Sequence, residues 1–527
     1  MDLVGERNLR DLLEERAALY GDRDYLIAED KAGAIERFSY RAFDERVNQV
    51  ANGLLADGIR AGDKVVIHLP NIPPFLLTLF ALAKIGVVAV PTNIACTADE
   101  LVYLFDFSEA VALVSEPAFR GAYMPALAKC PRIERIYEAR TDAPEAGFRR
   151  WDALWQGQAT ALPASLPRVP SGALAQILFT SGTTARPKGV MHTHAHMVWS
   201  GEQTAMIARY VPGERALTPL PCFHVNAQSL SVLGPMTAGC TLVLLEGFSA
   251  SRFWQQVRRH KANVIPMLPA LMRPLLLRPP SAGDRDHEIR IAIYGINCAE
   301  REKAEFEQRF DVEILNGYGL TEALTVVTSA PIHGRRQWPS VGPAAIGREV
   351  KIVDPDGQEV APREIGELLV KGVPGRTIML GYYKNPTATQ ETLSDGWLRT
   401  GDNFWADESG YLYFVDRKKD IIKRGGENIS ASEVELALME HPSIKECAVI
   451  AVPDPIKDEA VKAFVVLRPG AALRVDDIIA HCQRLLARFK GPQFVEIRDE
   501  LPKTPVGKVE KKLLRQEEAD KAARATS

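Results

Sequence analysis

The most informative stretch of this chain reads Thr180-Ser181-Gly182-Thr183-Thr184-Ala185-Arg186-Pro187-Lys188-Gly189. It follows an apolar run, residues 175–179, that predicts a buried strand. Glycines let successive backbone N–H groups point inward, and hydroxyls and an ammonium add further donors. The stretch therefore predicts a loop that cradles a polyphosphate, with a solvated turn as the alternative. It is not a Walker loop, because the Gly-x4-Gly-Lys-Ser/Thr spacing is missing.

Helical and strand patterns alternate on both sides of this loop. Before it, apolar spacing predicts a helix over 43–55, a strand over 64–69, a helix over 75–85 and a strand over 87–91. A second run begins at Ile177 and continues through strands at 242–245, 264–266 and 291–294. This rhythm predicts mostly parallel sheets covered by helices, arranged as two α/β lobes.

The pattern changes after about residue 341. Short predicted strands at 350–353, 366–372 and 411–415, separated by Gly, Pro and Asp turns, indicate a smaller β-rich lobe. A charged run at 416–420 follows, and then a helix over 433–441 and strands at 446–452 and 463–467. We therefore expect an α/β protein with an N-terminal domain over 1–418 and a small, mobile α+β domain over 419–527.

Composition narrows the classes of function. The chain has 527 residues, 46% hydrophobic and 25% charged, with a net charge of −3, so no whole-chain attraction to nucleic acid is expected. The longest apolar stretch, residues 75–90, is too short to span a membrane and contains Lys84. Seven scattered cysteines indicate reduced thiols. We expect a cytoplasmic monomer or homodimer that acts on small molecules.

Three histidines, His192, His194 and His196, alternate just after the loop. No second group of metal ligands stands near them in the sequence, and a strand or loop flank is the favoured interpretation over a metal site.

Three further motifs stand downstream. Asn316-Gly317-Tyr318-Gly319-Leu320-Thr321-Glu322 offers a flexible backbone beside an aromatic ring and a carboxylate that suits Mg²⁺, although a turn into a helix is the plain alternative. Asp402, after Gly401, can accept hydrogen bonds from a ribose diol or form an Asx turn. Lys508 lies in a Pro/Gly-shaped turn and taken alone resembles a surface lysine.

In this order the motifs resemble the adenylate-forming superfamily, which includes acyl-CoA synthetases, adenylation domains of nonribosomal synthetases and beetle luciferases. The resemblance covers about Tyr40 to Leu514. It implies an ATP- and CoA-dependent enzyme that carries Mg²⁺. It also implies that Thr180, Ser181, Gly182, Thr183, Thr184 and Lys188 hold the phosphates, and that Asn316, Gly317, Tyr318 and Gly319 lie along adenine.

The resemblance assigns further roles. Glu322 would coordinate Mg²⁺, Thr321 would touch phosphate, and Asp402 and Arg417 would bind the ribose. Lys508 would be the catalytic lysine that bridges the substrate carboxylate and the α-phosphate. Lys419 would be the hinge between the two half-reactions. Lys423, Gly425 and Gly426 would turn toward the pantetheine tunnel.

The chain departs from the family pattern at two places. Ala185 stands where the loop usually has glycine, and Tyr294-Gly295-Ile296-Asn297-Cys298 replaces a Gly-Gly-Ala type segment beside the acyl site. Residues 294–297, 335–342 and 456–463 look most like the carnitine/crotonobetaine-CoA ligase branch. Motif adjacency gives the candidate acyl pocket: His224, Val225, Asn226, Tyr294, Gly295, Ile296, Asn297 and Leu320.

The predicted reaction converts a carboxylic acid, ATP and CoA into acyl-CoA, AMP and pyrophosphate through an acyl-adenylate. The acid is either carnitine- or crotonobetaine-like, held through cation–π attraction to Tyr294, or a short- or medium-chain or aryl acid. The alternative function is a stand-alone enzyme that adenylates a carboxylic or amino acid without CoA. An amino-acid enzyme would usually place an acidic residue near the substrate amine, and the region around His224 shows none.

Overall fold

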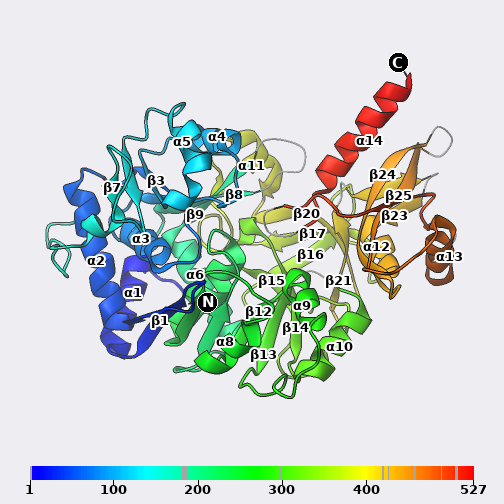
Figure 1. Ribbon diagram of the computed structural model, residues 1–527, viewed down its shortest axis with the longest axis horizontal. Coiled ribbons are helices and arrows are strands. Elements are labelled where there is room, and N and C mark those ends of the chain that lie inside the picture. Colours follow the sequence, from blue (N-terminus) through cyan, green and yellow to red (C-terminus); the bar gives the residue numbers. More distant parts are fainter. Residues whose placement is uncertain are drawn as a thin grey trace.

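The computed structural model describes residues 3–180, 187–295, 298–417, 420–424, 427–454, 458–487, 490–504 and 508–526. In Figure 1 a large N-terminal part, blue to yellow, carries a smaller C-terminal part, orange to red, at one end. The fold is mixed α/β, as the sequence predicts.

The first large sheet has the strand order β18-β9-β8-β4-β3-β5-β6-β7. From β8 to β7 the strands are parallel, whereas β9 and β18 run antiparallel at one edge. The strand bounds in that order are Gly381–Tyr382, Lys188–Thr193, Leu174–Thr180, Val88–Pro91, Lys64–Ile67, Ala112–Ser115, Arg135–Glu138 and Arg149–Arg150.

Alternation along β3 shows how this sheet is covered. Val65 and Ile67 pack with α2 (Tyr40–Ala56) and α3 (Pro73–Lys84), whereas Val66 packs with α4 (Ala98–Ser108) and α5 (Arg120–Leu127) on the opposite face. Successive side chains of a strand point to opposite faces, so an apolar run buried on both sides is expected between two helical layers.

The second large sheet has the order β15-β14-β13-β12-β10-β11-β1-β2 and is parallel except for its edge strands β15 and β2. The bounds in that order are Val326–Ser329, Ile314–Gly319, Ile291–Gly295, Val264–Met267, Arg215–Thr218, Thr241–Leu245, Asp24–Glu29 and Ile35–Ser39. The other helices of the two α/β lobes are α1, α6, α7, α8, α9 and α10, with bounds Leu9–Tyr20, His194–Ala208, Gly234–Ala238, Phe253–His260, Pro269–Leu276 and Glu300–Phe310.

The membership of the two sheets differs from the predicted lobes. The sequence pattern assigns the strand at Ile177 to the second run, but β8 pairs with β4 of the first sheet, with Gln176 opposite Ala89. In turn β1, near the N-terminus, pairs with β11 of the second sheet, with Leu26 opposite Leu242. Both strands are buried and apolar. Hydropathy along the chain therefore cannot tell which sheet such a strand joins.

The predicted β-rich lobe is a sheet with the order β16-β17-β20-β19 and with β21 paired to β20. The bounds are Glu349–Val353, Gly366–Lys371, Trp397–Ala406, Leu393–Ser394 and Leu412–Arg417, and α11 spans Pro386–Thr392. Its core joins residues from all three N-terminal sheets, including Val190, Val327 and Leu368. This shared core ties the β-rich lobe to both α/β lobes.

The C-terminal part is an α+β unit. Its sheet has the order β23-β22-β25-β24, with β26 on β25, and bounds Glu427–Ser430, Ile421–Arg424, Asp458–Leu467, Ile444–Asp454 and Phe494–Arg498. The helices α12 (Ala431–Met439) and α13 (Val475–Leu485) cover one face, and α14 (Lys511–Thr526) contributes Leu514 to a core on the other.

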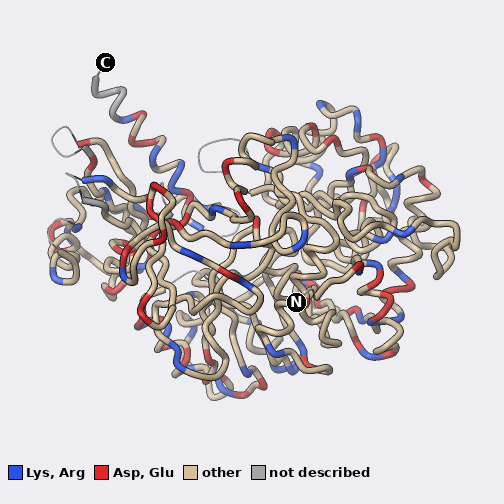
Figure 2. Tube along the Cα trace, turned by 180° about the vertical axis from the view of Figure 1, so that it is seen from behind, with Lys and Arg blue, Asp and Glu red and all other residues tan. Residues whose placement is uncertain are grey.

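Charged residues of both signs are spread over the chain. Viewed from behind, acidic and basic residues are interspersed along the trace (Figure 2). Among the residues described here, no helix has the length and apolar character needed to cross a membrane. All seven cysteines are free thiols.

Candidate active site

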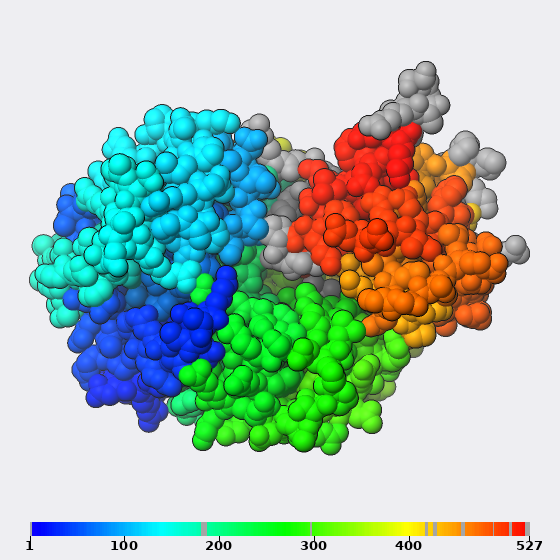
Figure 3. All heavy atoms as spheres, viewed as in Figure 1, coloured from blue at the N-terminus to red at the C-terminus, as the bar shows by residue number. Residues whose placement is uncertain are grey.

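One cavity of about 2130 Å³ brings together most of the predicted site residues that the structure describes. Figure 3 shows this face of the molecule hollowed where the blue-cyan, green and red parts of the chain meet. The predicted residues that line the cavity are Thr180, Lys188, His224, Val225, Asn226, Tyr294, Gly295, Gly317, Tyr318, Gly319, Leu320, Thr321, Glu322, Asp402 and Lys508.

The other predicted residues fall into three groups. Ser181, Gly182, Thr183, Thr184, Ile296, Asn297, Lys419, Gly425 and Gly426 lie outside the described residues. Asn316 and Lys423 are described but are not among the residues that line the cavity. Arg417 ends strand β21, and only its backbone is described. Lys423 is exposed on β22, and its backbone N–H donates to Glu459 at 2.6 Å.

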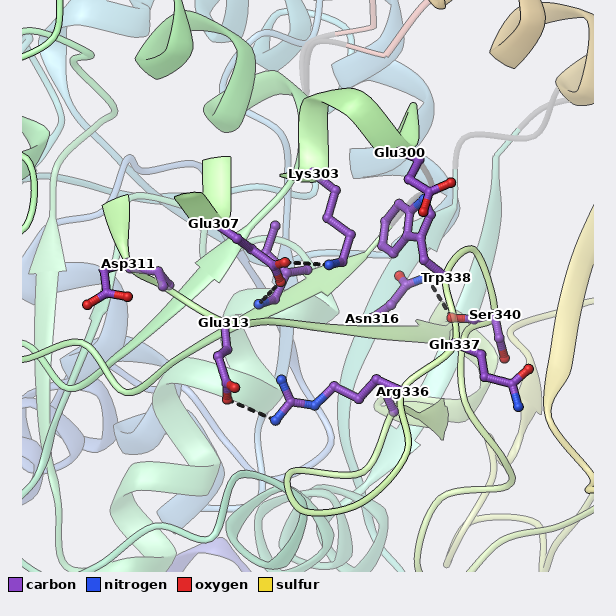
Figure 4. Close-up of a pocket in the computed structure, with 13 residues that line it drawn as sticks. Glu300, Lys303, Glu307, Asp311, Glu313, Asn316, Arg336, Gln337, Trp338 and Ser340 are labelled. Carbon is purple, nitrogen blue, oxygen red and sulfur yellow. Dashed lines mark hydrogen bonds and ion pairs between the residues drawn. The ribbon is translucent and has the colours of Figure 1, made fainter. Parts of the chain in front are cut away.

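Asn316 faces away from the large cavity. Its amide Nδ2 donates to the carbonyl of Ser340 at 3.0 Å, and it lines a second pocket of about 480 Å³. Figure 4 shows this pocket with the ion pair between Arg336 and Glu313, and with Lys303 directed at Glu307. A contact of Asn316 with a nucleotide in the large cavity would therefore have to come from its backbone.

The antiparallel strands β8 and β9 place the phosphate-side groups. Thr180 ends β8 and Lys188 begins β9, and the two residues face each other in the antiparallel register. The hydroxyl of Tyr103 donates to the carbonyl of Pro187 at 3.0 Å, which anchors one end of the loop. The residues that flank the predicted phosphate loop, Thr180 and Lys188, therefore lie side by side at the same end of the β8–β9 pair, and both line the cavity.

Asp402 is held by Tyr318. The Tyr318 hydroxyl donates to Oδ2 of Asp402 at 2.6 Å, and Asp402 is 8% exposed. Burial, and then the Asp402 charge, raise the pKa of Tyr318 well above its ordinary value, so the phenol stays a donor. Gly401, with φ at 71°, supplies the left-handed turn before Asp402. Across the strand pair, Asp402 lies opposite Arg417, which brings the two predicted ribose residues together along the backbone.

Glu322 lies in a short 3₁₀ turn, Thr321–Ala323, and contacts a residue that sequence reasoning missed. The hydroxyl of Tyr382 donates to Oε1 of Glu322 at 2.8 Å. The ammonium of Lys188 lies 4.6 Å from the centroid of the same ring. No signal in the sequence marks Tyr382, because its partners are 60 and 194 residues away along the chain.

The buried side chain of Arg348 holds the backbone of the turn that carries Glu322. Arg348 donates to the carbonyls of Ala323 at 2.9 Å and Thr377 at 2.6 Å, and its guanidinium lies 4.2 Å from the Trp199 ring centroid. His196 also contacts the Ala323 carbonyl, at 3.1 Å. Burial lowers the pKa of Arg348 to about 9. Because Ala323 follows Glu322, these contacts fix the backbone that carries the carboxylate.

This part of the cavity fits Mg²⁺. The described residues contain no cluster of three or more His, Cys, Asp or Glu side chains able to hold a metal alone. Mg²⁺ usually binds one or two carboxylates and takes its other ligands from phosphates and water. Glu322 offers one carboxylate beside the phosphate-side groups, which is the donor set such a nucleotide-borne ion needs.

Lys508 reaches the cavity from the C-terminal part. Its turn is closed by Thr504, whose N–H donates to the Lys508 carbonyl at 2.7 Å. Burial, and then the Lys508 charge, lower the pKa of His224 to about 4. His224 therefore stays neutral near pH 7. The structure places the predicted catalytic lysine and the predicted acyl pocket within electrostatic reach of each other.

The candidate acyl pocket is polar on one side. After His224 and Asn226 the chain forms a seven-residue π-helix, Ala227–Leu233. Such helices are rare and often mark functional sites. Ser229 of this helix lines the cavity; its hydroxyl accepts a hydrogen bond from the Ser200 hydroxyl at 3.0 Å and shares another with the Thr204 hydroxyl at 2.9 Å.

Tyr294 does not present an open ring to this pocket. It is 1% exposed, and its ring lies 6.0 Å from that of Trp338. Burial raises the pKa of Tyr294 well above its ordinary value. An aromatic wall for a quaternary ammonium, as the sequence predicts, would need a rotation of this ring.

Comparisons with known proteins agree over nearly the whole chain. Residues 13–383 match the family described as AMP-binding enzyme, and residues 433–508 match the AMP-binding enzyme C-terminal domain. A crotonobetaine/carnitine–CoA ligase of Escherichia coli O9:H4 (strain HS) is 38% identical over 521 residues, 98% of this chain and 100% of that protein.

Solved structures give the same result for the fold. An anthranilate CoA ligase in complex with anthranoyl-AMP has a TM-score of 0.90 at 26% identity and covers 99% of both chains. ATP-bound MatB from Rhodopseudomonas palustris has a TM-score of 0.86 at 28% identity, over 97% of this chain and 99% of that one. With both matched domains and a relative aligned end to end, this chain belongs to the AMP-binding enzyme family of adenylate-forming enzymes.

Proposed function

We propose that this protein is an AMP-forming acid–CoA ligase that converts a small carboxylic acid, ATP and CoA into acyl-CoA, AMP and pyrophosphate. The observation that carries the proposal is a single cavity that collects Lys188, Glu322, Asp402 and, from the C-terminal part, Lys508. The 38% identical relatives are themselves CoA ligases, which supports CoA as the acceptor.

The residues divide the first half-reaction between them. A carboxylate is a poor electrophile, and its conversion to an acyl-AMP supplies a good leaving group. The displacement at the α-phosphorus depends on positioning and charge neutralisation. We assign Lys188 and the 180–184 loop to the phosphates, Glu322 to Mg²⁺ and Asp402 with Arg417 to the ribose. Lys508 would face the charge that develops at the α-phosphate.

The second half-reaction brings the CoA thiol to the acyl carbonyl. We propose that residues 419–527 turn about Lys419 for this step and bring Lys423 and the Gly425-Gly426 segment toward the thiol. The reduced cysteines, together with the use of ATP and CoA, support a cytoplasmic location.

For the substrate we propose a small acid with a polar tail, tested first with crotonobetaine and carnitine. Two observations support it: the relatives' activity, and the polar side of the pocket formed by His224, Asn226 and Ser229. An uncharged aliphatic or aryl acid is the second candidate. The Tyr294 ring is buried, and the carboxylate of Glu302, which lines the cavity, already pairs with Arg273 at 2.8 Å.

The test is AMP and acyl-CoA formation with crotonobetaine, carnitine, hexanoate, octanoate and benzoate, each with and without CoA. We expect AMP rather than ADP, and turnover that requires CoA. Formation of ADP would contradict the reaction class, and CoA-independent turnover would favour a stand-alone adenylating enzyme. A kcat/KM about tenfold higher for an uncharged acid, or about 1.4 kcal/mol, would reject the betaine and keep the ligase.

A further inference from the structure

Tyr382 contacts two charged side chains of the cavity, Glu322 and Lys188. It is 6% exposed and lines the cavity. Its hydroxyl donates to Oε1 of Glu322 at 2.8 Å, and the centroid of its ring lies 4.6 Å from Nζ of Lys188. One side chain therefore contacts both a carboxylate suited to Mg²⁺ and an ammonium suited to phosphate.

The backbone leaves Tyr382 little freedom. It lies on β18, opposite Val190 of β9, two residues beyond Lys188. Its N–H donates to Oγ1 of Thr389 at 2.8 Å. Just upstream, the N–H of Met379 donates to the Glu322 carbonyl at 2.7 Å. The short segment 379–382 is thus joined by backbone hydrogen bonds both to the strand that carries Lys188 and to the turn that carries Glu322.

We propose that Tyr382 is a positioning residue that sets the placement of Glu322 and Lys188 for a metal-bound nucleotide. The proposal rests on the proposed function, since it assumes that ATP binds in this cavity. The phenol would fix the orientation of the Glu322 carboxylate, which would then hold the ion.

The two contacts suit these tasks chemically. A tyrosine hydroxyl ordinarily keeps its proton up to about pH 10, so this hydroxyl is a donor at neutral pH. A ring face attracts an ammonium without neutralising it, as a carboxylate would. Lys188 thus stays oriented while its full positive charge remains for the phosphates.

Two substitutions separate the two contacts. Tyr382→Phe removes the hydroxyl and keeps the ring, whereas Tyr382→Leu removes both. Binding of Mn²⁺ to the ATP-bound protein is followed by electron paramagnetic resonance, and binding of metal-free ATP by calorimetry. Because a hydrogen bond to a charged group is lost, we expect Tyr382→Phe to raise the Kd of Mn²⁺ about tenfold. Only Tyr382→Leu should also weaken the binding of metal-free ATP, because only this variant loses the ring that contacts Lys188.

The neighbouring Tyr383 gives a matched control. Its hydroxyl donates to Oε2 of Glu109 at 2.7 Å, and it is not among the residues that line the cavity. Tyr383→Phe removes an equivalent hydrogen bond and should bind Mn²⁺ and ATP as the unsubstituted protein does. Thermal unfolding of each variant reports any loss of folded protein.

Three results would overturn the proposal. The first is an equal Kd of Mn²⁺ for Tyr382→Phe and Tyr383→Phe. The second is a loss of binding that only follows the unfolded fraction. The third is a rise in the KM of the acid and of CoA as large as the rise in the KM of ATP. The binding of Mn²⁺ and ATP can be measured without any acid. If both bind with the predicted dependence on Tyr382 but no acyl-CoA forms, the proposed function is wrong and the role of Tyr382 stands.

Discussion

The proposed ribose site depends on the hydrogen bond between Tyr318 and Asp402. A carboxylate that must accept from a ribose diol has to be oriented, and the phenol at 2.6 Å provides this orientation. We predict that Tyr318→Phe raises the KM for ATP about fivefold to tenfold and changes the KM of the acid little. Steady-state kinetics with each substrate varied in turn measures the effect.

Tyr413 supplies the control for that substitution. Its hydroxyl donates to Oε1 of Gln337 at 2.7 Å, and Tyr413 is not among the residues that line the cavity. Tyr413→Phe should leave the KM for ATP unchanged. An equal rise in KM for both variants would show that Tyr318 acts through general stability and not through Asp402.

Lys508 is the residue on which the first half-reaction should depend most strongly. Its charge faces the cavity near His224, where negative charge would build on the α-phosphate. We predict that Lys508→Ala slows adenylation about 10²- to 10³-fold and leaves thioester formation from supplied acyl-AMP largely intact. The exposed Lys512 is a control, since Lys512→Ala should affect neither step. Equal losses in both steps would contradict the assignment.

At the scale of elements, the junction of β9 and α6 makes stability depend on pH. Burial lowers the pKa of His192 to about 3 and of His194 to about 4, from an ordinary 6.5. Below pH 6.5 the unfolded chain takes up protons that the folded protein excludes. Stability is therefore lost as the pH falls from about 6.5 toward 4, by about 1.4 kcal/mol per pH unit for each histidine.

The prediction is a fall in the unfolding temperature from pH 7 to pH 5 that His194→Gln makes shallower. Gln cannot be protonated, so one of the protons taken up on unfolding is removed. The exposed His333 is the matched control, and His333→Gln should leave the slope unchanged. A flat profile between pH 7 and pH 5 in the unsubstituted protein would show that these histidines already bind protons in the folded state.

At the scale of the whole molecule, the C-terminal part contacts the rest through Ala299, which packs with the C-terminal apolar core, and through polar contacts with residues 415 and 416. The Ser430 hydroxyl donates to the Val415 carbonyl at 2.8 Å, and the Ser432 N–H donates to Asp416 at 3.0 Å. Helix α12 thus begins against the last strand of the β-rich lobe. A rotation of the C-terminal part about Lys419 would have to break these hydrogen bonds.

We predict that Lys419→Pro spares adenylation and impairs thioester formation, the reverse of Lys508→Ala. Proline holds φ near about −65° and would restrict a hinge. Single-turnover assays of each half-reaction measure the difference, with Lys512→Ala as the control. A variant that keeps full thioester formation would show that Lys419 is not the hinge.

Single helices and strands could be predicted from the sequence, whereas the pairing of some strands could not. Helices α2 and α3 and the strands β3, β4 and β11 follow from local apolar spacing, because burial of one face or both faces dictates the period. The placement of β8 in the first sheet and β1 in the second did not follow. A buried apolar strand satisfies its backbone equally well in either sheet, so its partner is chosen by packing of the whole domain.

By itself the sequence determined the fold class, the order of the motifs and a set of site residues, most of whose described members line one cavity. It could do so because the residue types that each motif needs stand within a few neighbouring positions. Only the tertiary structure decided that Tyr382 bridges Lys188 and Glu322, that Asn316 faces a different pocket and that Tyr294 is closed. These facts depend on side-chain directions and on partners far apart along the chain. Sheet registry and packing create such contacts, and no local pattern encodes them.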